Sequence, residues 1–330
     1  VAGGGRIYAV ASDAEVFALD LAGREVWRRT LGSPEARRSA SIAAAPLYYR
    51  GRLVVTKVSG DLIAMDAVTG EERWRASLGG PIGAAPNWIA AEDRVDGLVI
   101  AVIQSRGIVV ALDGANGREV WRAEALERCD SPPACDNGLI VIGSCQAALH
   151  VLDARNGAER FRARLGDDSQ VAGGVALNRG VAFTGSRSGS LIAVDLATGN
   201  VLWRTDPGNA EIFSTPAIAG DLVLSASEDG TVSAVERLTG ALHWSRKLSA
   251  DSANVVAGGE NAIVVTAGRL IILNTANGEE RSSVKVSDHI TGPALTGGLI
   301  LVGTDEGHLV AYESGPGTSR QPPALETEVP

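Results

Sequence analysis

The chain has 330 residues, of which 45% are hydrophobic, with 40 glycines and a formal net charge of −9. This composition is typical of a globular protein rich in turns, and the length allows two ordinary domains or one closed array of repeats. The acidic balance argues against a general nucleic-acid or anionic-membrane binder, because such a protein presents a basic surface. No apolar run reaches the about 18 residues of a membrane span, and the first residues do not resemble a signal segment.

One pattern recurs along the chain about every forty residues. It consists of an apolar pair, an acidic residue, a short turn with glycine, and an aromatic residue four positions after that glycine, as in Ala64-Met65-Asp66, Thr69-Gly70 and Trp74. The acidic position or its counterpart falls at eight places: Asp20, Asp66, Asp113, Asp153, Asp195, Glu236, Asn274 and Glu313. A fixed period of this length indicates an array of equivalent units.

Each unit contains short runs of alternating or β-branched residues bounded by glycine turns. In the sixth unit these runs predict strands over 214–219, 220–225, 231–235 and 241–244, and the early Pro216 suits a strand start. No window repeats with the period near 3.6 of a helical solenoid. Four strands in each of eight units predict an all-β fold, an eight-bladed β-propeller of four-stranded antiparallel blades.

The residues that recur in each unit have structural roles. Thr-Gly and Asn-Gly supply the positive φ of a tight turn between the third and fourth strands. The aromatic residue should project from the outer strand and pack against the neighbouring blade, where an indole N–H finds a partner. These docking positions are Trp27, Trp74, Trp121, Phe161, Trp203 and Trp244, whereas the seventh unit has Ser282.

This pattern resembles the tryptophan-docking motif of the PQQ-type repeat, which occurs in pyrroloquinoline-quinone dehydrogenases and in the BamB family. The resemblance covers residues 1 to about 315 and implies one propeller domain over 1–317 with a flexible tail over 318–330. It implies a non-catalytic scaffold in the periplasm or another extracytoplasmic place, with association with the outer membrane as one option, that binds membrane-associated protein partners. We expect no cofactor, no metal and no catalytic residues.

Two other functions remain open. The first is a PQQ- and calcium-dependent alcohol or sugar dehydrogenase, although the chain has no Cys-Cys pair and is much shorter than those enzymes. The second is a ligand-sensing ectodomain. The four histidines are far apart and lack the spacing of a metal site. The chain as given has no N-terminal lipid-anchor cysteine, which speaks against a strict BamB assignment.

The three cysteines lie in the fourth unit, around the turn Asn137-Gly138. A two-residue turn would place Asp136 opposite Leu139, and therefore Cys129 opposite Cys145. We predict a Cys129–Cys145 disulfide, with reduced thiols and a metal site as the alternatives. Such a disulfide would indicate an oxidising compartment.

A partner is expected on the face formed by the connections between blades and by the turns between second and third strands. The repeat lengthens at 31–45 and at 79–96, and the second of these segments contains Trp88, which we expect to pack against its own hairpin. Ile212 and Phe213 either fill the centre of the ring or meet a partner. The candidate partner residues are Arg37, Arg38, Lys57, Arg106, Arg128, Arg187, Ile212 and Phe213.

The two ends bear on ring closure. Residues 1–4 are expected to form the inner strand of the first blade, and 309–313 the third strand of the eighth. We expect residues upstream of Val1, or a partner chain, to supply the fourth strand of the eighth blade, because an open ring leaves a strand edge unpaired.

Overall fold

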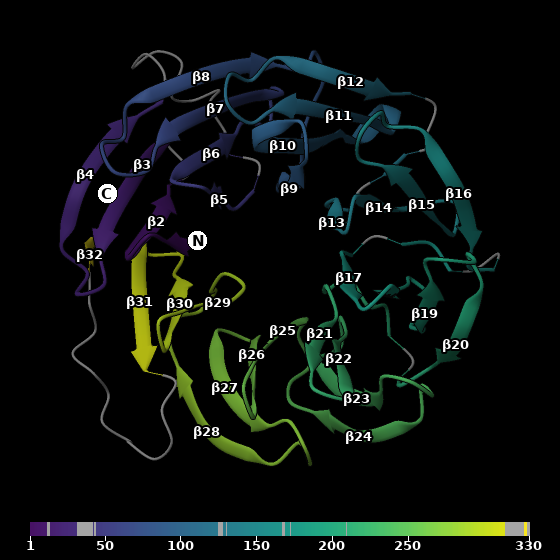
Figure 1. Ribbon diagram of the computed structural model, residues 1–330. Helices are drawn as coiled ribbons and strands as arrows, with labels where there is room; N and C mark the ends of the chain where they lie inside the picture. Colours follow the sequence, from purple (N-terminus) through teal and green to yellow (C-terminus); the bar gives the residue numbers. More distant parts are fainter. Residues whose placement is uncertain are drawn as a thin grey trace.

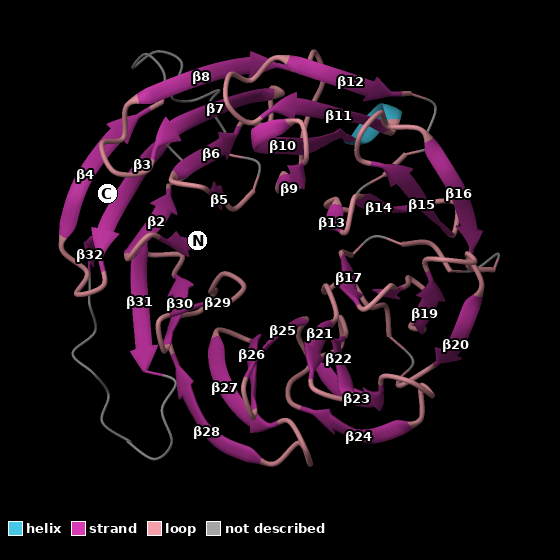
Figure 2. Cartoon of the chain, in the orientation of Figure 1, coloured by secondary structure: helices cyan, strands magenta, loops and turns pink. Residues whose placement is uncertain are grey.

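The computed structural model describes residues 1–11, 14–31, 42, 44–124, 128–129, 131–166, 169–171, 173–208, 210–313 and 327–328. The chain forms eight four-stranded sheets that follow one another around a ring (Figure 1). All pairings within the sheets are antiparallel, as in β6–β7 and β7–β8. The predicted eight-bladed β-propeller is confirmed. Besides strands, the described residues contain one 3-10 turn, η2 (Gln104–Arg106) (Figure 2).

The first four blades contain β1 (Ala2–Gly3), β2 (Arg6–Val10), β3 (Glu15–Asp20) and β4 (Glu25–Thr30); β5 (Leu47–Tyr49), β6 (Arg52–Thr56), β7 (Asp61–Asp66) and β8 (Glu72–Ser77); β9 (Asn87–Ala91), β10 (Arg94–Ile103), β11 (Ile108–Asp113) and β12 (Glu119–Ala123); and β13 (Ala134–Asp136), β14 (Leu139–Ser144), β15 (Ala148–Asp153) and β16 (Glu159–Arg164).

The other four blades contain β17 (Val175–Asn178), β18 (Val181–Gly185), β19 (Leu191–Asp195) and β20 (Val201–Thr205); β21 (Ala217–Ala219), β22 (Leu222–Ala226), β23 (Thr231–Glu236) and β24 (Leu242–Lys247); β25 (Ala253–Gly258), β26 (Asn261–Thr266), β27 (Arg269–Asn274) and β28 (Glu280–Lys285); and β29 (Ala294–Thr296), β30 (Leu299–Gly303), β31 (His308–Glu313) and β32 (Thr327–Glu328).

The order of strands defines two faces of the ring. The hairpins between first and second strands and the glycine turns between third and fourth strands lie on one side, which we call the turn face. The turns between second and third strands and the connections between blades lie on the other, which we call the loop face. Both faces are built by residues outside the regular strands, where binding residues of rigid scaffolds concentrate.

The hairpins on the turn face are set by residues that adopt positive φ. Between β13 and β14, Asn137 (φ 46°) and Gly138 (φ 75°) form a two-residue turn, and Asp136 lies opposite Leu139 as the sequence predicted. Both central residues of such a turn need positive φ, which asparagine and glycine tolerate best. The hairpin therefore fixes the register in which β14 presents its side chains.

The hydrophobic core lies between adjacent blades. One cluster joins Tyr49, Val54 and Trp74 of the second blade to Val99 and Val110 of the third. The same arrangement recurs between the third and fourth blades and between the fourth and fifth. Each sheet is thus covered on both faces by its neighbours, so its second and third strands are buried along most of their length rather than on alternate residues.

The eighth blade closes with the chain's own C-terminal segment. Thr327 and Glu328 form β32, which pairs with Leu309 and His308 of β31. The expectation that an upstream segment or a partner chain supplies this strand is therefore wrong. Of the segment 318–330, expected as a tail, only these two residues are described.

Candidate functional site

The recurrent aromatic residues join each blade to the next. The indole Nε1 of Trp27 donates a hydrogen bond to the Ala67 carbonyl at 3.2 Å, and Trp74 does the same to Gly114 at 3.0 Å. In every case the acceptor is the carbonyl of the residue that directly follows the acidic position of the next blade's turn, which is Asn274 in the seventh blade. The remaining bonds are Trp121 to Ala154 (2.9 Å), Trp203 to Arg237 (3.0 Å) and Trp244 to Thr275 (2.8 Å).

The glycine of each turn makes room for the aromatic ring. A Cβ on Gly117 would lie 2.5 Å from Cε3 of Trp74, and Gly117 also has a φ of 71°. Phe161 occupies the equivalent place on Gly199, at 2.9 Å from the position of its Cβ. Glycine is therefore needed twice, for the turn conformation and for the close approach of the ring.

The acidic residue holds the turn together. Asp66 accepts hydrogen bonds from the backbone amides of Val68 and Thr69, and its other oxygen lies 2.7 Å from Arg73. The hydrogen bond from Arg73 is the main cause that lowers the pKa of Asp66 to about 2, and the backbone bonds act in the same direction. Asp66 thus stabilises its turn, and Asp153 accepts equivalent hydrogen bonds from the Arg155 amide and from Arg160.

Backbone hydrogen bonds between neighbouring blades order the loop face. At five places a buried residue in a connection, or at the start of the strand that follows it, donates its amide to a carbonyl of the preceding blade, as Ile212 does to Ser186 at 3.0 Å. We call these buried residues the plug residues; they are Ile82, Cys129, Val171, Ile212 and Ala253. Their acceptors are Val58, Gln104, Ser144, Ser186 and Ser227. Since the plug residues recur blade after blade, they fix the connections relative to one another.

Three of the predicted partner residues are exposed on this loop face. Arg106, Arg128 and Arg187 all have exposed side chains, on the third, fourth and fifth blades. The guanidinium of Arg187 lies 4.9 Å from the centre of the half-buried Phe213 ring, which is a cation–π contact. Arg187 and Phe213 thus present an aromatic surface covered by a cation.

The same face is acidic on the later blades. The exposed carboxylates there are Glu211, Glu228, Asp251, Asp288, Asp305 and Glu306. Some of them are balanced locally, since Lys285 lies 3.4 Å from Asp288. The exposed arginines Arg106, Arg128 and Arg187 come from blades three to five, so basic and acidic side chains meet near Phe213 and Glu211.

Two predicted partner residues do not face a partner. Lys57 is 8% exposed, and its Nζ donates to the carbonyl of Leu31 at 3.1 Å. Ile212 is 1% exposed, and a Cβ on Gly185 would lie 2.2 Å from Ile212 Cγ2. The prediction is corrected for both: Lys57 ties its blade to the preceding connection, and Ile212 fills the space that Gly185 leaves.

Arg37 and Arg38 lie outside the described residues, as does most of the lengthened segment 31–45. The other lengthened segment is described. Trp88 donates from Nε1 to the Asp96 carbonyl at 2.7 Å, and its ring stacks on Tyr49 at 6.1 Å between centroids. Trp88 thus packs against its own hairpin, as expected.

The cysteines of the fourth blade lie close together along the backbone. The amide of Cys145 donates to the carbonyl of Arg128 at 3.1 Å, which places Cys145 beside Cys129. Cys135 lies opposite Ile140, as the register predicted, and burial raises the pKa of its thiol to about 12. A thiol with this pKa is unreactive at neutral pH. The Cys129–Cys145 disulfide stays a prediction.

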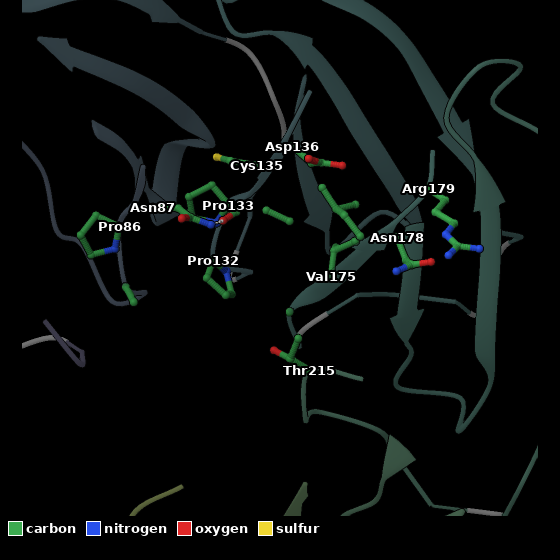
Figure 3. A pocket seen from close by; sticks show the side chains of 14 residues that line it. Pro86, Asn87, Pro132, Pro133, Cys135, Asp136, Val175, Asn178, Arg179 and Thr215 are labelled. Atoms are coloured by element: carbon green, nitrogen blue, oxygen red, sulfur yellow. Dashed lines mark hydrogen bonds between the residues drawn. The ribbon is translucent and has the colours of Figure 1, made fainter. Parts of the chain in front are cut away.

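A hollow lies at the inner strands of the third to sixth blades. It has a volume of about 600 Å³ and is lined by Ala85, Pro86, Asn87, Pro132, Pro133, Ala134, Cys135, Asp136, Gly174, Val175, Leu177, Asn178, Arg179 and Thr215 (Figure 3). A second hollow of about 400 Å³ on the turn face shares Arg179 with it and is lined by Leu139, Arg179, Gly180, Val181, Asp195, Leu196 and Ala197.

Within the part of the chain that the structure describes, no group of three His, Cys, Asp or Glu side chains is placed to hold a metal ion. The same residues contain no helix with the length and apolar character to cross a membrane.

Known proteins with similar sequences agree with this architecture. The family model described as outer membrane protein assembly factor BamB matches residues 12–105, 105–172 and 166–292. Among curated relatives, BamB of Moranella endobia is 25% identical over 54% of this chain and 50% of its own length, and BamB of Burkholderia pseudomallei is 26% identical over 57% and 53%. The chain spans about half the length of these relatives.

Solved structures show the same fold. The crystal structure of BamB from Moraxella catarrhalis superposes with a TM-score of 0.78, at 23% identity and 94% coverage of both chains. Quinohemoprotein alcohol dehydrogenase from Comamonas testosteroni superposes with a TM-score of 0.72, at 14% identity over 92% of this chain and 69% of that one. Because the family model covers most of the sequence, and the repeated turns and indole contacts match the motif expected of it, the chain belongs to the BamB family.

Proposed function

We propose that this protein is a non-catalytic, extracytoplasmic scaffold that assists the assembly of outer-membrane proteins by binding other proteins of the assembly complex through its loop face. The observation that carries the proposal is the set of exposed side chains Arg106, Arg128, Arg187 and Phe213 on a face whose connections are fixed by hydrogen bonds between blades. Relatives named as outer membrane protein assembly factors support it.

Several physical features suit this role. Arginine and aromatic residues are enriched at the energetic centres of protein interfaces. A fixed backbone lowers the conformational entropy that is lost when a partner binds. The backbone that carries Arg106, Arg128 and Arg187 therefore needs little ordering when a partner binds. The proposal places the partner on blades three to five, with Arg37 and Arg38, from the connection between the first and second blades, as further candidate contacts.

The non-catalytic part of the proposal also rests on the repeated acids. A quinone dehydrogenase needs acidic and amide side chains that converge on calcium, whereas Asp66 and Asp153 are engaged by their own turns and by arginines. The similarity to the quinohemoprotein dehydrogenase is at the level of the fold, and function does not follow from fold.

The test is affinity capture from a solubilised membrane fraction, with partners identified by mass spectrometry. The wild-type chain should retain outer-membrane assembly proteins, and the double variant Arg106→Glu/Arg187→Glu should retain at least tenfold less, because two reversed charges oppose the complementary surface. Arg118→Glu makes the same kind of charge change at an exposed position of the turn face and should have no effect.

A dye-linked alcohol oxidation assay with added quinone and calcium tests the alternative function, a quinone-dependent dehydrogenase. Activity there would contradict the non-catalytic assignment. Unchanged capture by Arg106→Glu/Arg187→Glu would contradict the proposed loop-face site.

A further inference from the structure

The junction between the fourth and fifth blades differs in one hydrogen bond from the five junctions that contain a docking tryptophan. At those five junctions the carbonyl after the turn acid, or after its counterpart Asn274, accepts an indole N–H at 2.8 to 3.2 Å. At this junction the aromatic residue is Phe161, which has no donor. Within the described ranges, no donor reaches the carbonyl of Leu196, although Leu196 is only 8% exposed. A carbonyl that is removed from most solvent and lacks a donor costs free energy.

From this junction we propose that the hollow between blades four and five on the turn face binds the side chain of a tryptophan carried by an extended segment of a partner protein. The hollow of about 400 Å³ is lined by Leu139, Val181, Leu196 and Ala197 on its apolar side, with Arg179 at its edge. Its size lies within the range of about 300–1,000 Å³ that ligand pockets occupy.

At the junction between the first and second blades, the side chain of Arg6 fills the space that is equivalent to this hollow. Arg6 begins β2 opposite Asp20, as Leu139 begins β14 opposite Asp153. The guanidinium of Arg6 donates to the carbonyls of Ala67 and Val68, at 3.1 and 2.6 Å. These carbonyls correspond to those of Leu196 and Ala197. Because leucine replaces arginine at position 139, the donor is missing at the fifth blade.

The hollow favours an indole over a second guanidinium. Arg179 is exposed and already places one positive charge at its edge, so a cationic side chain would be repelled. An aromatic ring would instead be attracted to that guanidinium. The chain makes four such contacts elsewhere, with arginines 4.6 to 5.9 Å from the centroids of Phe17, Trp27, Trp88 and Phe213. A tyrosine O–H can also reach such a carbonyl, as Tyr8 does at Ala67 and Tyr49 at Gly114, but the indole N–H is the donor that all five tryptophan junctions share.

The larger hollow provides space for the residues that flank the tryptophan. Arg179 lines both hollows, so they adjoin. In Figure 3 the side chains of Asn178 and Arg179 come from the end of the inner strand β17, with Asp136 and Cys135 of β13 beside them. These polar groups and the inner edges of both strands can bond the backbone of an extended segment.

The test uses N-acetyl-tryptophanamide as the probe, with N-acetyl-phenylalaninamide as the matched probe without an indole N–H. Binding to the full chain is followed by ligand-observed NMR titration. We expect saturable binding of the tryptophan probe with a Kd of about 1 mM, and at least fivefold weaker binding of the phenylalanine probe. Equal binding of the two probes would overturn the proposal.

Two variants locate the site. Leu139→Arg copies Arg6 into the hollow and should abolish binding, whereas Leu238→Arg adds the same charge at a turn residue that is 76% exposed and should leave it unchanged. Phe161→Trp supplies the missing indole from within the chain and should remove the preference for the tryptophan probe, even if Leu139→Arg fails to fold. Preserved selectivity in both variants would contradict the site.

This site is independent of the loop-face proposal, because it lies on the opposite face of the ring. The variant Arg106→Glu/Arg187→Glu should bind the tryptophan probe like the wild type. Loss of probe binding in that variant would mean that the probe reports on the loop face, which would also overturn the assignment.

Discussion

Blades one to six and blades seven and eight are built from the same repeat but are joined with very different strength. In the first group an aromatic residue of the outer strand packs on the next blade, and the five docking tryptophans are at most 9% exposed. In the seventh blade Ser282 takes this place and is exposed. Among the described residues, the outer strand of the eighth blade pairs at two positions, against five in the first and second blades. The repeat thus sets the architecture everywhere, and apolar clusters join blades seven and eight as well, but the aromatic contact between outer strand and turn is confined to the first group.

The largest expected effect comes from removing one of these aromatics. Trp74→Ala should lower the free energy of unfolding by about 3–5 kcal/mol, because it opens a cavity in the core and leaves the Gly114 carbonyl without its indole donor. Ser282→Ala at the equivalent place should change it by less than about 0.5 kcal/mol. Equilibrium denaturation in urea measures both, and equal losses would refute the contrast between the two groups of blades.

The glycine beneath the ring should be the next most sensitive position. In Gly117→Ala the alanine would have to adopt a positive φ, and its Cβ would lie 2.5 Å from Trp74. Overpacking should lower the free energy of unfolding by about 1–3 kcal/mol, in addition to the cost of the backbone strain. At Gly138 the φ is also positive, but a Cβ would meet nothing within 4 Å. Gly138→Ala should therefore cost only the strain, about 1–2 kcal/mol. Thermal unfolding of the pair separates ring packing from turn conformation.

Hydrogen exchange should show where the ring opens first. The amides of β30 and β31 should exchange at least tenfold faster than those of β7 and β11, because their blade is held by a short outer strand and a junction without an aromatic residue. Native-state exchange followed by mass spectrometry measures this difference. Uniform protection around the ring would show that closure at the eighth blade is as strong as the other junctions.

The smallest expected effect concerns acid. Asp66 has its pKa lowered to about 2, so its contribution to stability is present above pH 4 and is lost as the pH falls toward 2. The seventh blade has Asn274 at this place, which cannot titrate. Asp66→Asn should reduce the loss of stability between pH 4 and pH 2 by less than about 1 kcal/mol, because the pair with Arg73 is largely exposed. Denaturation curves at the two pH values provide the measurement.

The blades, their hairpins and the aromatic docking positions could be predicted because each depends on residues close together in sequence. Asn137-Gly138 fixes a turn, and Gly70 followed by Trp74 fixes a packing site. Lys57 and Ile212 could not be placed in this way. Both lie at the boundary between a strand and a connection, where one residue decides whether a side chain faces a partner or the next blade.

The hollow beside Leu196 was also beyond sequence reasoning, although a signal was present. Phe161 was assigned to the same position as the five tryptophans, and its missing N–H has a consequence only when the acceptor on the next blade is known. Likewise, the correspondence between Arg6 and Leu139 becomes visible once the strands are aligned through Asp20 and Asp153.

At the plug positions the blades are joined by a hydrogen bond from the backbone amide. The side chain at these positions can therefore be exchanged for another buried side chain. Isoleucine, valine, alanine and cysteine all occupy the place and are all buried. A valine in the variant Cys129→Val should therefore pack at position 129 as Val171 packs at the equivalent position of the next blade. The substitution would remove the sulfur atom beside Cys145. Any phenotype of that substitution would measure sulfur chemistry separately from shape.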